Sequence, residues 1–371
     1  MVRCRALAVI AAACLAAAAC GSSSSSSGSS ASSGSSPFVV GYTPLNNLVN
    51  QYQVAWKNQL QQGVQAAGGT LKVCLPGTSA TQQANCVQQF ISSKVNAIVI
   101  YAIDAQAMIG PIKAANKAHI PVVGFVSEFP SAGEQVAFSV NVDDAGAGAL
   151  AGHALVQALT QKYGSPKGTV LEIQGLLTTS AAQLRGSGFH QVVNQYPNIK
   201  VVSKPANWDT SMATTIIQDW MSAHPDTDAM YFQSEGGYLP AAEAVLKKLH
   251  RWVPAGQPGH VILVGEDGTN IGLNAVKCGY MEEDGDYALG DFTPLAAKLI
   301  IQMLKTGSIP KAGQVIPDPG TMWKQATVLS NASVAGPIVN IPATAITKSN
   351  ASDPRLFGNK FQGAPNGLSA C

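Results

Sequence analysis

The chain has 371 residues and a formal net charge of +2, from 23 Lys and Arg against 21 Asp and Glu. Arg3 and Arg5 account for this excess, and residues 20–371 are formally neutral. Because nucleic-acid binding depends on clustered cations, this balance argues against a nucleic-acid-binding protein. The length suits two domains.

Residues 1–19 predict a cleaved targeting segment. Two arginines precede ALAVIAAACLAAAA, an apolar stretch too short to span a bilayer in a mature protein. Small residues precede Cys20 and GSSSSSSG follows it, which resembles a bacterial lipoprotein signal. That family is cut before the cysteine, whose sulfur carries a diacylglycerol, so we expect Cys20 to be the lipidation site. Ala17 stands where leucine is more usual, Cys14 is a second candidate, and an ordinary cleaved signal is the alternative.

Residues 20–36 are interpreted as a flexible tether. The segment after Cys20 is almost entirely serine and glycine, so it buries too little apolar surface to fold. No later stretch of the sequence approaches the length of a membrane-spanning helix. A tether after a lipid would hold the folded body away from the membrane surface.

Short apolar runs then alternate with longer stretches of helical periodicity. In a first series, the predicted strands are 38–43, 70–75, 96–102, 120–126 and 135–142, and the predicted helices are 49–69, 79–94, 105–119 and 143–164. In a second series, the predicted strands are 168–175, 199–206, 228–234 and 260–267, and the predicted helices are 180–197, 210–225, 236–250 and 270–279.

Strands followed by helices imply parallel sheets with right-handed crossovers, and two series imply two doubly wound parallel-sheet α/β domains. We expect a hinge of three segments, near Val142–Asp143, Asp286–Ala288 and Ser308–Pro310. The expected parts are an N-terminal ligand-binding lobe (37–142 plus 288–308), a C-terminal lobe (143–287 plus 309–340) and an extended tail (341–371). The stretch TMWKQATVLS (321–330) predicts a final strand.

Ligands bind beyond the carboxyl ends of the strands in such sheets, so two facing domains make a cleft. No G-x-G-x-x-G opens the helix after the first strand and no G-x-x-x-x-G-K-[ST] occurs, so we expect no nucleotide cofactor. Metal binding is not expected, because no C-x-x-C occurs and the six histidines are scattered. The acidic run at 282–286 lacks an EF-hand pattern and is interpreted as a solvated strand end.

Four cysteines remain outside the signal and Cys20, an even number that permits disulfides in an oxidising compartment. Cys74 and Cys86 are the natural local pair. Cys278 with Cys371 would then join the tail to the body. Buried free thiols are the alternative.

Six stretches, in order, carry a family resemblance. They are IVIYAIDAQAM (98–108), ANKAHIPVVGF (115–125), EIQGLLTTSAAQLRGSGF (172–189), NWDTSMA (207–213), AHPDTDAMYFQSE (223–235) and VGEDGTNIG (264–272). Together they resemble the sugar-binding proteins of bacterial ABC importers, the ribose-binding branch with the type I periplasmic-binding-protein fold. The resemblance covers roughly 38–308.

The resemblance implies a lipid-anchored, monomeric binding protein on the outer side of the cell membrane. It would deliver a small polar solute, most simply a sugar, to an ABC permease. A receptor that reports its ligand to a membrane signalling partner is the alternative. An enzyme is not expected, because no G-x-S-x-G elbow occurs and no pair of opposed carboxylates is marked out.

The resemblance also implies ligand residues. Arg185 matches an arginine that hydrogen-bonds sugar hydroxyls, Trp208 an aromatic that stacks on the ring, and Asp267 a carboxylate that accepts two hydroxyl hydrogen bonds. The alternatives are a salt-bridged arginine on a surface helix, a partly buried loop aromatic and a helix-capping aspartate. Ser234 and Glu235 stand where the family has an Asn-Asp pair.

The remaining candidates depart further from the family. Tyr101 replaces an asparagine, and Val126-Ser127-Glu128 stands where the family often has Asp-Arg. Glu128 is the candidate carboxylate there, and the alternative is that the ligand lacks a hydroxyl group at that point or is not ribose. In the first loop, the competing candidates are Asn47, Asn50, Gln51 and Tyr52. Tyr52 is the best aromatic candidate, with a core contact as its alternative. Asp286 lies near the position of a late glutamine in the family, with Tyr287 as the neighbouring choice.

Overall fold

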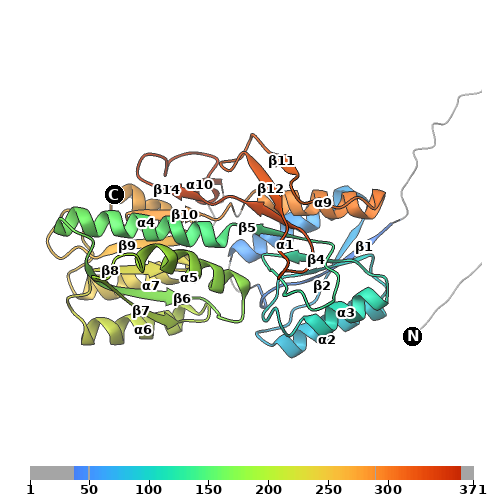
Figure 1. The fold of residues 1–371 in the computed structure, drawn as a ribbon, viewed down its shortest axis with the longest axis horizontal. Helices are drawn as coiled ribbons and strands as arrows, with labels where there is room; N and C mark the ends of the chain where they lie inside the picture. The colour runs from blue at the N-terminus through green and yellow to red at the C-terminus, as the bar shows by residue number, and fades with distance from the viewer. Residues whose placement is uncertain (1–36, 49–50, 289, 361–371) are drawn as a thin grey trace, which may run out of the picture. The chain divides into compact units, whose positions relative to one another are not determined.

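The computed structural model describes residues 37–48, 51–288 and 290–360, without the side chains of Gln51 and Tyr52. The described chain forms two sheets (Figure 1). We call the eight-stranded sheet and its helices the first lobe, and the six-stranded sheet and its helices the second lobe. The predicted signal, tether, Cys20, Asn50 and Cys371 lie outside the described residues.

The first lobe has the strand order β11-β12-β13-β5-β4-β3-β1-β2. Its strands are β1 (Val39–Thr43), β2 (Thr70–Val73), β3 (Ala97–Ile100), β4 (Val122–Phe125), β5 (Phe138–Val142), β11 (Val315–Pro317), β12 (Gln325–Leu329) and β13 (Ile338–Ile341). Its helices are α1 (Gln51–Ala66), α2 (Ala80–Ser92), α3 (Ile109–Lys117) and α9 (Phe292–Thr306). Helices α1 and α9 pack on one face of the sheet, and α2 and α3 pack on the other.

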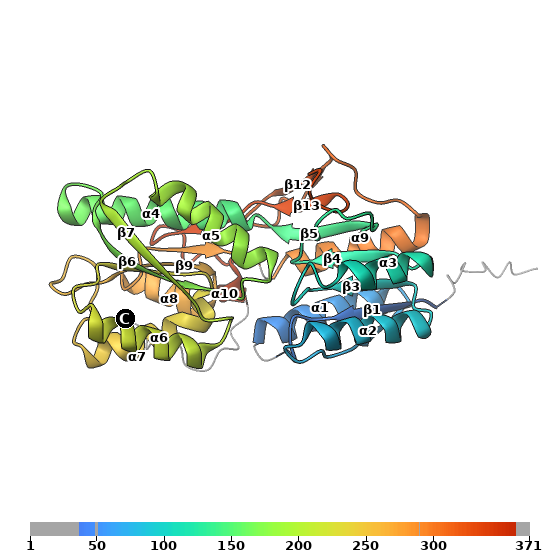
Figure 2. The same ribbon diagram turned by 60° about the horizontal axis from the view of Figure 1, so that its bottom comes forward.

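The second lobe has the strand order β14-β10-β9-β8-β6-β7. Its strands are β6 (Gly168–Gln174), β7 (Ile199–Pro205), β8 (Ala229–Phe232), β9 (Ile262–Asp267), β10 (Glu283–Asp286) and β14 (Thr344–Ile346). Its helices are α4 (Asp144–Tyr163), α5 (Ser180–Val193), α6 (Thr210–Ala223), α7 (Glu235–Lys248), α8 (Asn270–Cys278) and α10 (Phe357–Lys360). Helices α4 and α5 cover one face, and α6, α7 and α8 cover the other (Figure 2).

The prediction of two doubly wound α/β domains is confirmed. The strands from β1 to β10 pair in parallel, and β11, β12 and β14 pair antiparallel at sheet edges. Alternate residues of β3 belong to different core clusters, Val99 with α1 and α9, and Ile98 with α2 and α3. This alternation follows from the period of two in a strand, and it is why the buried strands are apolar throughout.

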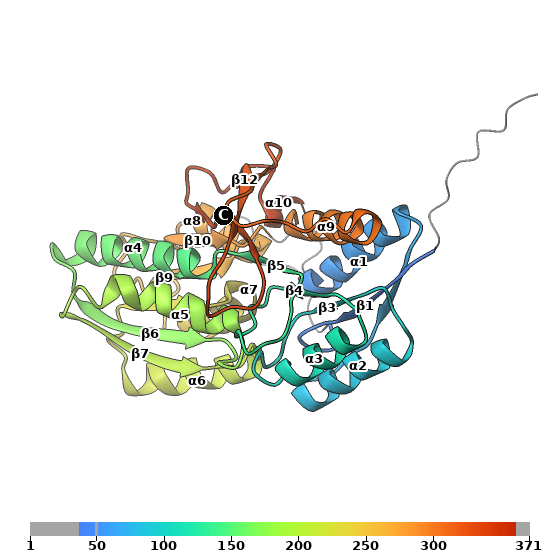
Figure 3. The same ribbon diagram turned by 45° about the vertical axis from the view of Figure 1, so that its right-hand side comes forward.

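The assignment of 309–340 to the C-terminal lobe is wrong. Strand β13 pairs in parallel with β5 of the first lobe, with Ile338 opposite Ser139 (Figure 2), and β12, which Figure 3 also shows, and β11 continue that sheet. These strands satisfy the backbone groups that β5 would otherwise leave at an open sheet edge. The third crossing between lobes therefore falls between Ile341 and Thr344, and not at Ser308–Pro310.

The prediction of an extended tail is also wrong for the described part of 341–371. Strand β14 pairs with β10, and α10 packs on α8, where the Gly358 amide donates to the Gly268 carbonyl. The side chain of Leu356 joins the second-lobe core, whereas that of Phe357 joins the first-lobe core. Lys360 reaches Asp291, before α9, at 2.7 Å. Apolar burial and this ion pair hold the segment across both lobes.

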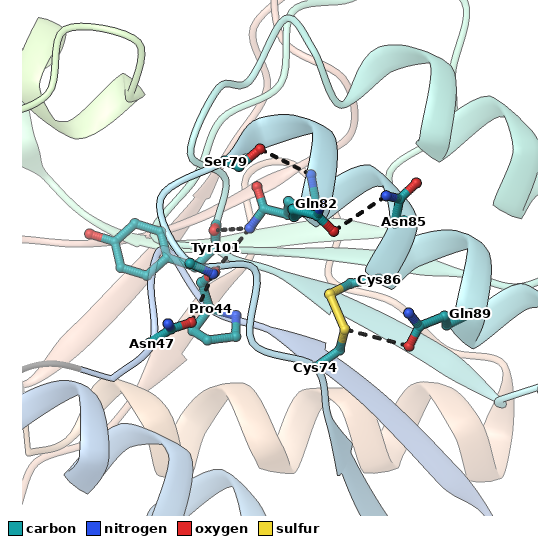
Figure 4. The surroundings of a disulfide bond; sticks show 11 residues. Pro44, Asn47, Cys74, Ser79, Gln82, Asn85, Cys86, Gln89 and Tyr101 are labelled. Atoms are coloured by element: carbon teal, nitrogen blue, oxygen red, sulfur yellow. Dashed lines mark hydrogen bonds between the residues drawn. A yellow bond between two sulfur atoms is a disulfide. The ribbon is translucent and has the colours of Figure 1, made fainter.

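A disulfide joins Cys74, after β2, to Cys86 on α2, with an S–S distance of 2.02 Å (Figure 4). Helix α2 begins where the Ser79 hydroxyl accepts a hydrogen bond from the Gln82 amide. Cys278 is also disulfide-bonded. Its predicted partner Cys371 lies outside the described residues, so that pairing stays a prediction. Within the described ranges, no helix combines the length and the apolar character that crossing a bilayer demands.

Replacing both Cys74 and Cys86 with alanine should lower the free energy of unfolding by about 3 kcal/mol, because the unfolded chain regains the freedom of a twelve-residue loop. Urea unfolding of the oxidised proteins measures this difference. Adding reductant to the double variant separates the contribution of Cys278, which stays bonded in it. An unchanged midpoint would show that the bond adds nothing to stability.

Candidate functional site

The carboxyl ends of the parallel strands of both lobes border one small cavity. The first lobe supplies Leu45 after β1, Gln53 and Trp56 of α1, and Tyr101 after β3. The second lobe supplies Ala181 and Arg185 of α5, Trp208 after β7, Ser234 after β8, Asp267 at the end of β9, and Tyr287 after β10. This is the place where ligands bind in open α/β sheets.

The cavity has a volume of about 30 Å³. That volume holds one or two water molecules and is far below the roughly 300–1,000 Å³ of ordinary ligand pockets. Larger depressions lie elsewhere, including one of about 520 Å³ beside Lys162 and His260. We assign the site to the small cavity, because charged, hydroxyl and aromatic side chains from both lobes converge only there among the described pockets.

Arg185 is 3% exposed, and acidic side chains surround it. Its Nε lies 2.9 Å from Asp144 Oδ1 and 2.9 Å from Glu266 Oε2, and its Nη1 lies 3.3 Å from Asp267 Oδ1. Nη1 also donates to the Gln233 carbonyl, and the guanidinium lies 4.2 Å from the centre of the Tyr287 ring. Burial alone would lower the pKa of Arg185, but Glu266 and the other neighbours raise it well above its usual value, so the guanidinium stays charged.

Close packing of α4 on α5 brings Asp144 to Arg185. Helix α4 begins with Asp143 as its cap, which places Asp144 in the first turn. A side chain at Gly148 would collide with the Arg185 carbonyl oxygen, and one at Gly188 would collide with the Ala145 carbonyl oxygen. Glycine at these positions lets the two backbones approach within reach of an ion pair, since any Cβ would push α5 away.

Asp267 ends β9 in a strained conformation, with φ at 136°, a region that L side chains rarely adopt. Its Oδ2 accepts a hydrogen bond of 2.5 Å from the Ser234 hydroxyl, and its Oδ1 faces Arg185. Burial raises the pKa of Asp267, and the charge of Arg185 opposes that rise. Trp208, with φ at 62°, is a second strained residue of the lining. Such strain persists only where surrounding contacts fix it, and it is frequent at functional sites.

Behind Arg185 lies a buried polar network. The Gln233 side chain donates to Glu172 at 2.9 Å and accepts from the Gly175 amide at 2.9 Å, while its carbonyl accepts from Arg185. The Tyr231 hydroxyl donates to Glu266. Burial raises the pKa of Glu266 to about 8 despite the opposing charge of Arg185. Groups on α4, on β9 and directly after β8 therefore contact the guanidinium together.

The first-lobe wall is largely aromatic. The Trp56 ring packs 5.3 Å from Phe292, 5.9 Å from Phe125 and 6.1 Å from Tyr101, measured between ring centres. The loops that carry this wall are tied together by Gln83 of α2, which donates to the carbonyls of Pro44 and Tyr101. Figure 4 shows Pro44 and Tyr101 beside α2.

Five of the predicted ligand residues line the cavity, namely Tyr101, Arg185, Trp208, Ser234 and Asp267. Three others, Glu235, Asp286 and Glu128, do not line it. Glu235 is buried beneath the site, where it accepts a 2.7 Å bond from the Thr269 amide, and burial raises its pKa to about 8. Asp286 accepts from the Ala288 amide, and burial raises its pKa to about 7. Asn50 and the side chain of Tyr52 lie outside the described residues.

Glu128 lies where the lobes touch beside the cavity. Its amide donates to the Ser180 hydroxyl of the second lobe at 3.1 Å, and Asn141 donates to its carboxylate at 3.4 Å. Close by, the Thr178 hydroxyl donates to the Ile103 carbonyl at 2.6 Å. These bonds connect the two lobes directly.

The sequence did not point to Gln53 or Trp56. Leu45 and Ala181 lie in the strand-end segments 43–52 and 178–185, which the rule for such sheets places at the cleft, and Tyr287 was the second choice beside Asp286. The position of Tyr287 directly after β10 was the available signal, since strand-end residues face the cleft. Gln53 and Trp56 lie on a helix whose apolar spacing indicated only a core contact. No group of three or more His, Cys, Asp or Glu within the described ranges is arranged to hold a metal ion.

The acidic run was predicted to be a solvated strand end, and this is wrong. Strand β10 lies between β9 and β14, and its side chains are covered by helices of the second lobe. Glu283, Asp284 and Asp286 are therefore buried. Within the described structure, neither oxygen of Glu283 has a hydrogen-bond partner. Burial, and then the charge of Glu266, raises the pKa of Glu283 well above its usual value.

Glu283→Gln should stabilise the protein progressively as the pH rises from 5 to 8.5. The folded state keeps a proton on Glu283 that the unfolded state releases near its ordinary pKa, so wild-type stability falls as the pH rises above that ordinary value. The amide has no proton to lose, and its gain in melting temperature should reach several degrees at pH 8.5. Thermal unfolding across this range tests the difference, with Asp219→Asn on the exposed face of α6 as control. Parallel wild-type and Glu283→Gln curves would contradict the assignment.

Known proteins resemble this chain in sequence and in fold. A family model described as "Periplasmic binding protein domain" matches residues 42–308. The ribose import binding protein of Salmonella typhimurium is 29% identical over 235 residues, which cover 63% of this chain and 74% of the relative. The xylitol-binding protein of Mycolicibacterium smegmatis is 32% identical over 199 residues, which cover 53% of each chain.

Solved structures share the fold. A galactofuranose binding protein superposes with a TM-score of 0.71 at 19% identity, over 85% of this chain and 97% of that one. An ABC transporter solute binding protein from Mycobacterium smegmatis, solved with bound glycerol, superposes with a TM-score of 0.70 at 24% identity. That alignment covers 90% of this chain and 99% of that one.

Proposed function

Because the chain belongs to the periplasmic binding protein family, we propose that it binds a small polar solute, most simply a sugar, between its lobes for an ABC importer. The resemblance recognised in the sequence is confirmed by this membership, and the solved relatives bear out the fold. The observation that carries the proposal is the convergence of Arg185, Ser234 and Asp267 with aromatic rings from both lobes on one cavity.

The chemistry of these groups suits a hydroxylated ligand. The planar guanidinium of Arg185 can donate to adjacent oxygens, and Asp267 can accept from hydroxyl groups. Trp208 offers a flat apolar face, and its ring lies against Gly175, where any side chain would collide with it. Because its family is one of binding proteins, we propose binding without catalysis.

The proposed mechanism is closure around the solute. A cavity of about 30 Å³ is too small for a sugar, so the lobes must separate for a ligand to enter. The three crossings, at Val142–Asp144, Asp286–Phe292 and Ile341–Thr344, are the segments that can bend. A solute that touches both lobes binds the closed state better, and this difference in affinity shifts the equilibrium towards closure.

We further propose that the protein works as a monomer outside the cytoplasmic membrane, where a permease receives its solute. The proposed lipid on Cys20 and the tether 20–36 would keep it near that permease. Two or more acyl chains anchor a protein stably, whereas one chain is marginal.

The proposal predicts that a sugar or related solute raises the melting temperature of the ligand-free full chain, since a ligand of the folded state stabilises it by mass action. Thermal unfolding against pentoses, hexoses, polyols, nucleosides and amino acids measures this shift. If no solute of the panel shifts the melting temperature, the support for solute import is removed and a receptor or scaffold role is favoured.

Ser234→Ala should weaken binding of the identified solute about tenfold, and Asp267→Asn should weaken it more, because each removes polar groups from the buried site. Titration calorimetry gives the affinities, and circular dichroism verifies folding. Asp219→Asn, far from the cavity on α6, should bind like the wild type. Unchanged affinity in both site variants would overturn the assignment of the cavity.

A further inference from the structure

Two hydrogen bonds join the lobes beside the cavity. The Thr178 hydroxyl of the second lobe donates to the Ile103 carbonyl of the first lobe at 2.6 Å, and the Glu128 amide of the first lobe donates to the Ser180 hydroxyl of the second at 3.1 Å. None of these four residues is among the described residues that line the cavity. Both bonds therefore depend on how closely the lobes meet, and not on which solute lies between them.

The first-lobe partners of these bonds are fixed by contacts within their own lobe. The Ile103 amide donates to the Gln83 side chain of α2 at 2.9 Å. The Ser127 hydroxyl accepts from the Ala102 amide at 2.8 Å, and the Ser127 amide donates to the Asn141 side chain at 3.0 Å. These bonds join the loops after β3 and β4, so the carbonyl and the amide that meet the second lobe keep their positions when the lobes separate.

The second-lobe partners lie at the start of the helix that carries Arg185. Thr179 caps α5, because its hydroxyl accepts from the Ala182 amide. Thr178 and Ser180 flank this cap, and Ser180 is the first residue of α5. At 3.6 residues per turn, Arg185 follows in the second turn of the same helix. Holding the first turn against the first lobe therefore also holds Arg185 at its distance from the aromatic wall.

Both bonds lie at the edge of the contact between the lobes. Thr178 is exposed, and Ser180 and Glu128 are partly buried. When the lobes separate, water can replace each bond, so opening leaves no polar group of this contact unpaired. The net contribution of such a hydrogen bond changes an equilibrium constant by about threefold to tenfold. Two bonds of this strength favour closure and still allow it to reverse.

We propose, on the basis of the proposed function, that Thr178 and Ser180 are positioning residues that form a latch between the lobes. The latch sets how long a solute stays bound and takes no part in the choice of solute. A solute enters the open state, in which the latch bonds are broken, so the latch does not affect the association rate. It slows dissociation, because the lobes must break both bonds before the solute can leave.

The double variant Thr178→Val/Ser180→Ala tests the latch on the full chain, unfolded and refolded without reductant to remove bound solute. The probes are D-ribose, D-xylose, D-galactose and xylitol, and the wider solute panel supplies a replacement if none of the four binds. Stopped-flow tryptophan fluorescence gives both rate constants, since Trp56 and Trp208 line the cavity. We expect dissociation about ten times faster than in the wild type for every probe that binds, with association rates within twofold.

Two single variants serve as controls. Thr178→Ser keeps the hydroxyl group and should dissociate at the wild-type rate, which shows that the hydroxyl and not the fold of the loop is responsible. Thr160→Val removes an exposed hydroxyl that donates to the Val156 carbonyl of its own helix, α4, and should also behave like the wild type.

Three results would overturn the latch and leave the proposed function intact. The first is an unchanged dissociation rate in the double variant. The second is an equal loss in the association rate. The third is a loss of affinity that differs more than threefold between probes, since the hydroxyl groups would then contact the solute. If no solute of the wider panel binds the wild type, the proposed function and the latch are both removed.

Discussion

The buried charge of Arg185 is the constraint on which the second lobe depends. An unpaired guanidinium inside a protein is strongly destabilising, so acidic partners must come from several elements at once. Glu266 and Asp267 come from β9, and Asp144 comes from the first turn of α4, which requires the glycine contact between α4 and α5. Since Asp144 directly follows the crossing at Val142, the same charge fixes the start of the second lobe beside the hinge.

More buried carboxyl groups surround this charge than one cation can neutralise. Burial raises the pKa of Glu235 to about 8, so a proton on this acid takes the place of a missing positive charge. Glu235 also lies against Asp284, beneath Asp267. A side chain at Gly272 of α8 would collide with the carboxyl groups of Glu235 and Asp284. The carboxylate of Asp267, which faces the cavity, therefore packs on buried acids that are largely protonated.

The sequence predicts the fold well where its signal is repetitive. Two series of apolar runs and amphipathic stretches specify two sheets, and the rule that ligands bind at strand ends brings Tyr101, Ser234 and Asp267 to one place. The sequence does not predict the pairing of β13, a four-residue strand whose partner β5 lies almost two hundred residues away, because no local sequence pattern identifies so distant a strand. The side chains of Glu128, Glu235 and Asp286 do not line the cavity, because proximity to a strand end does not fix the direction of a side chain. The acidic strand β10 was misjudged for a similar reason, since its burial depends on β9 and β14.

The corrected path of the chain passes between the lobes three times, so the first described strand, β1, and the last described helix, α10, belong to different lobes. An even number of passages would have left both on the same lobe. The chain before Phe38 therefore continues from the first lobe, and the second lobe is joined to it only through the three crossings. In the proposed closure, the proposed tether is attached to the lobe with the aromatic wall, and the lobe with Arg185 is the one whose position relative to that attachment changes.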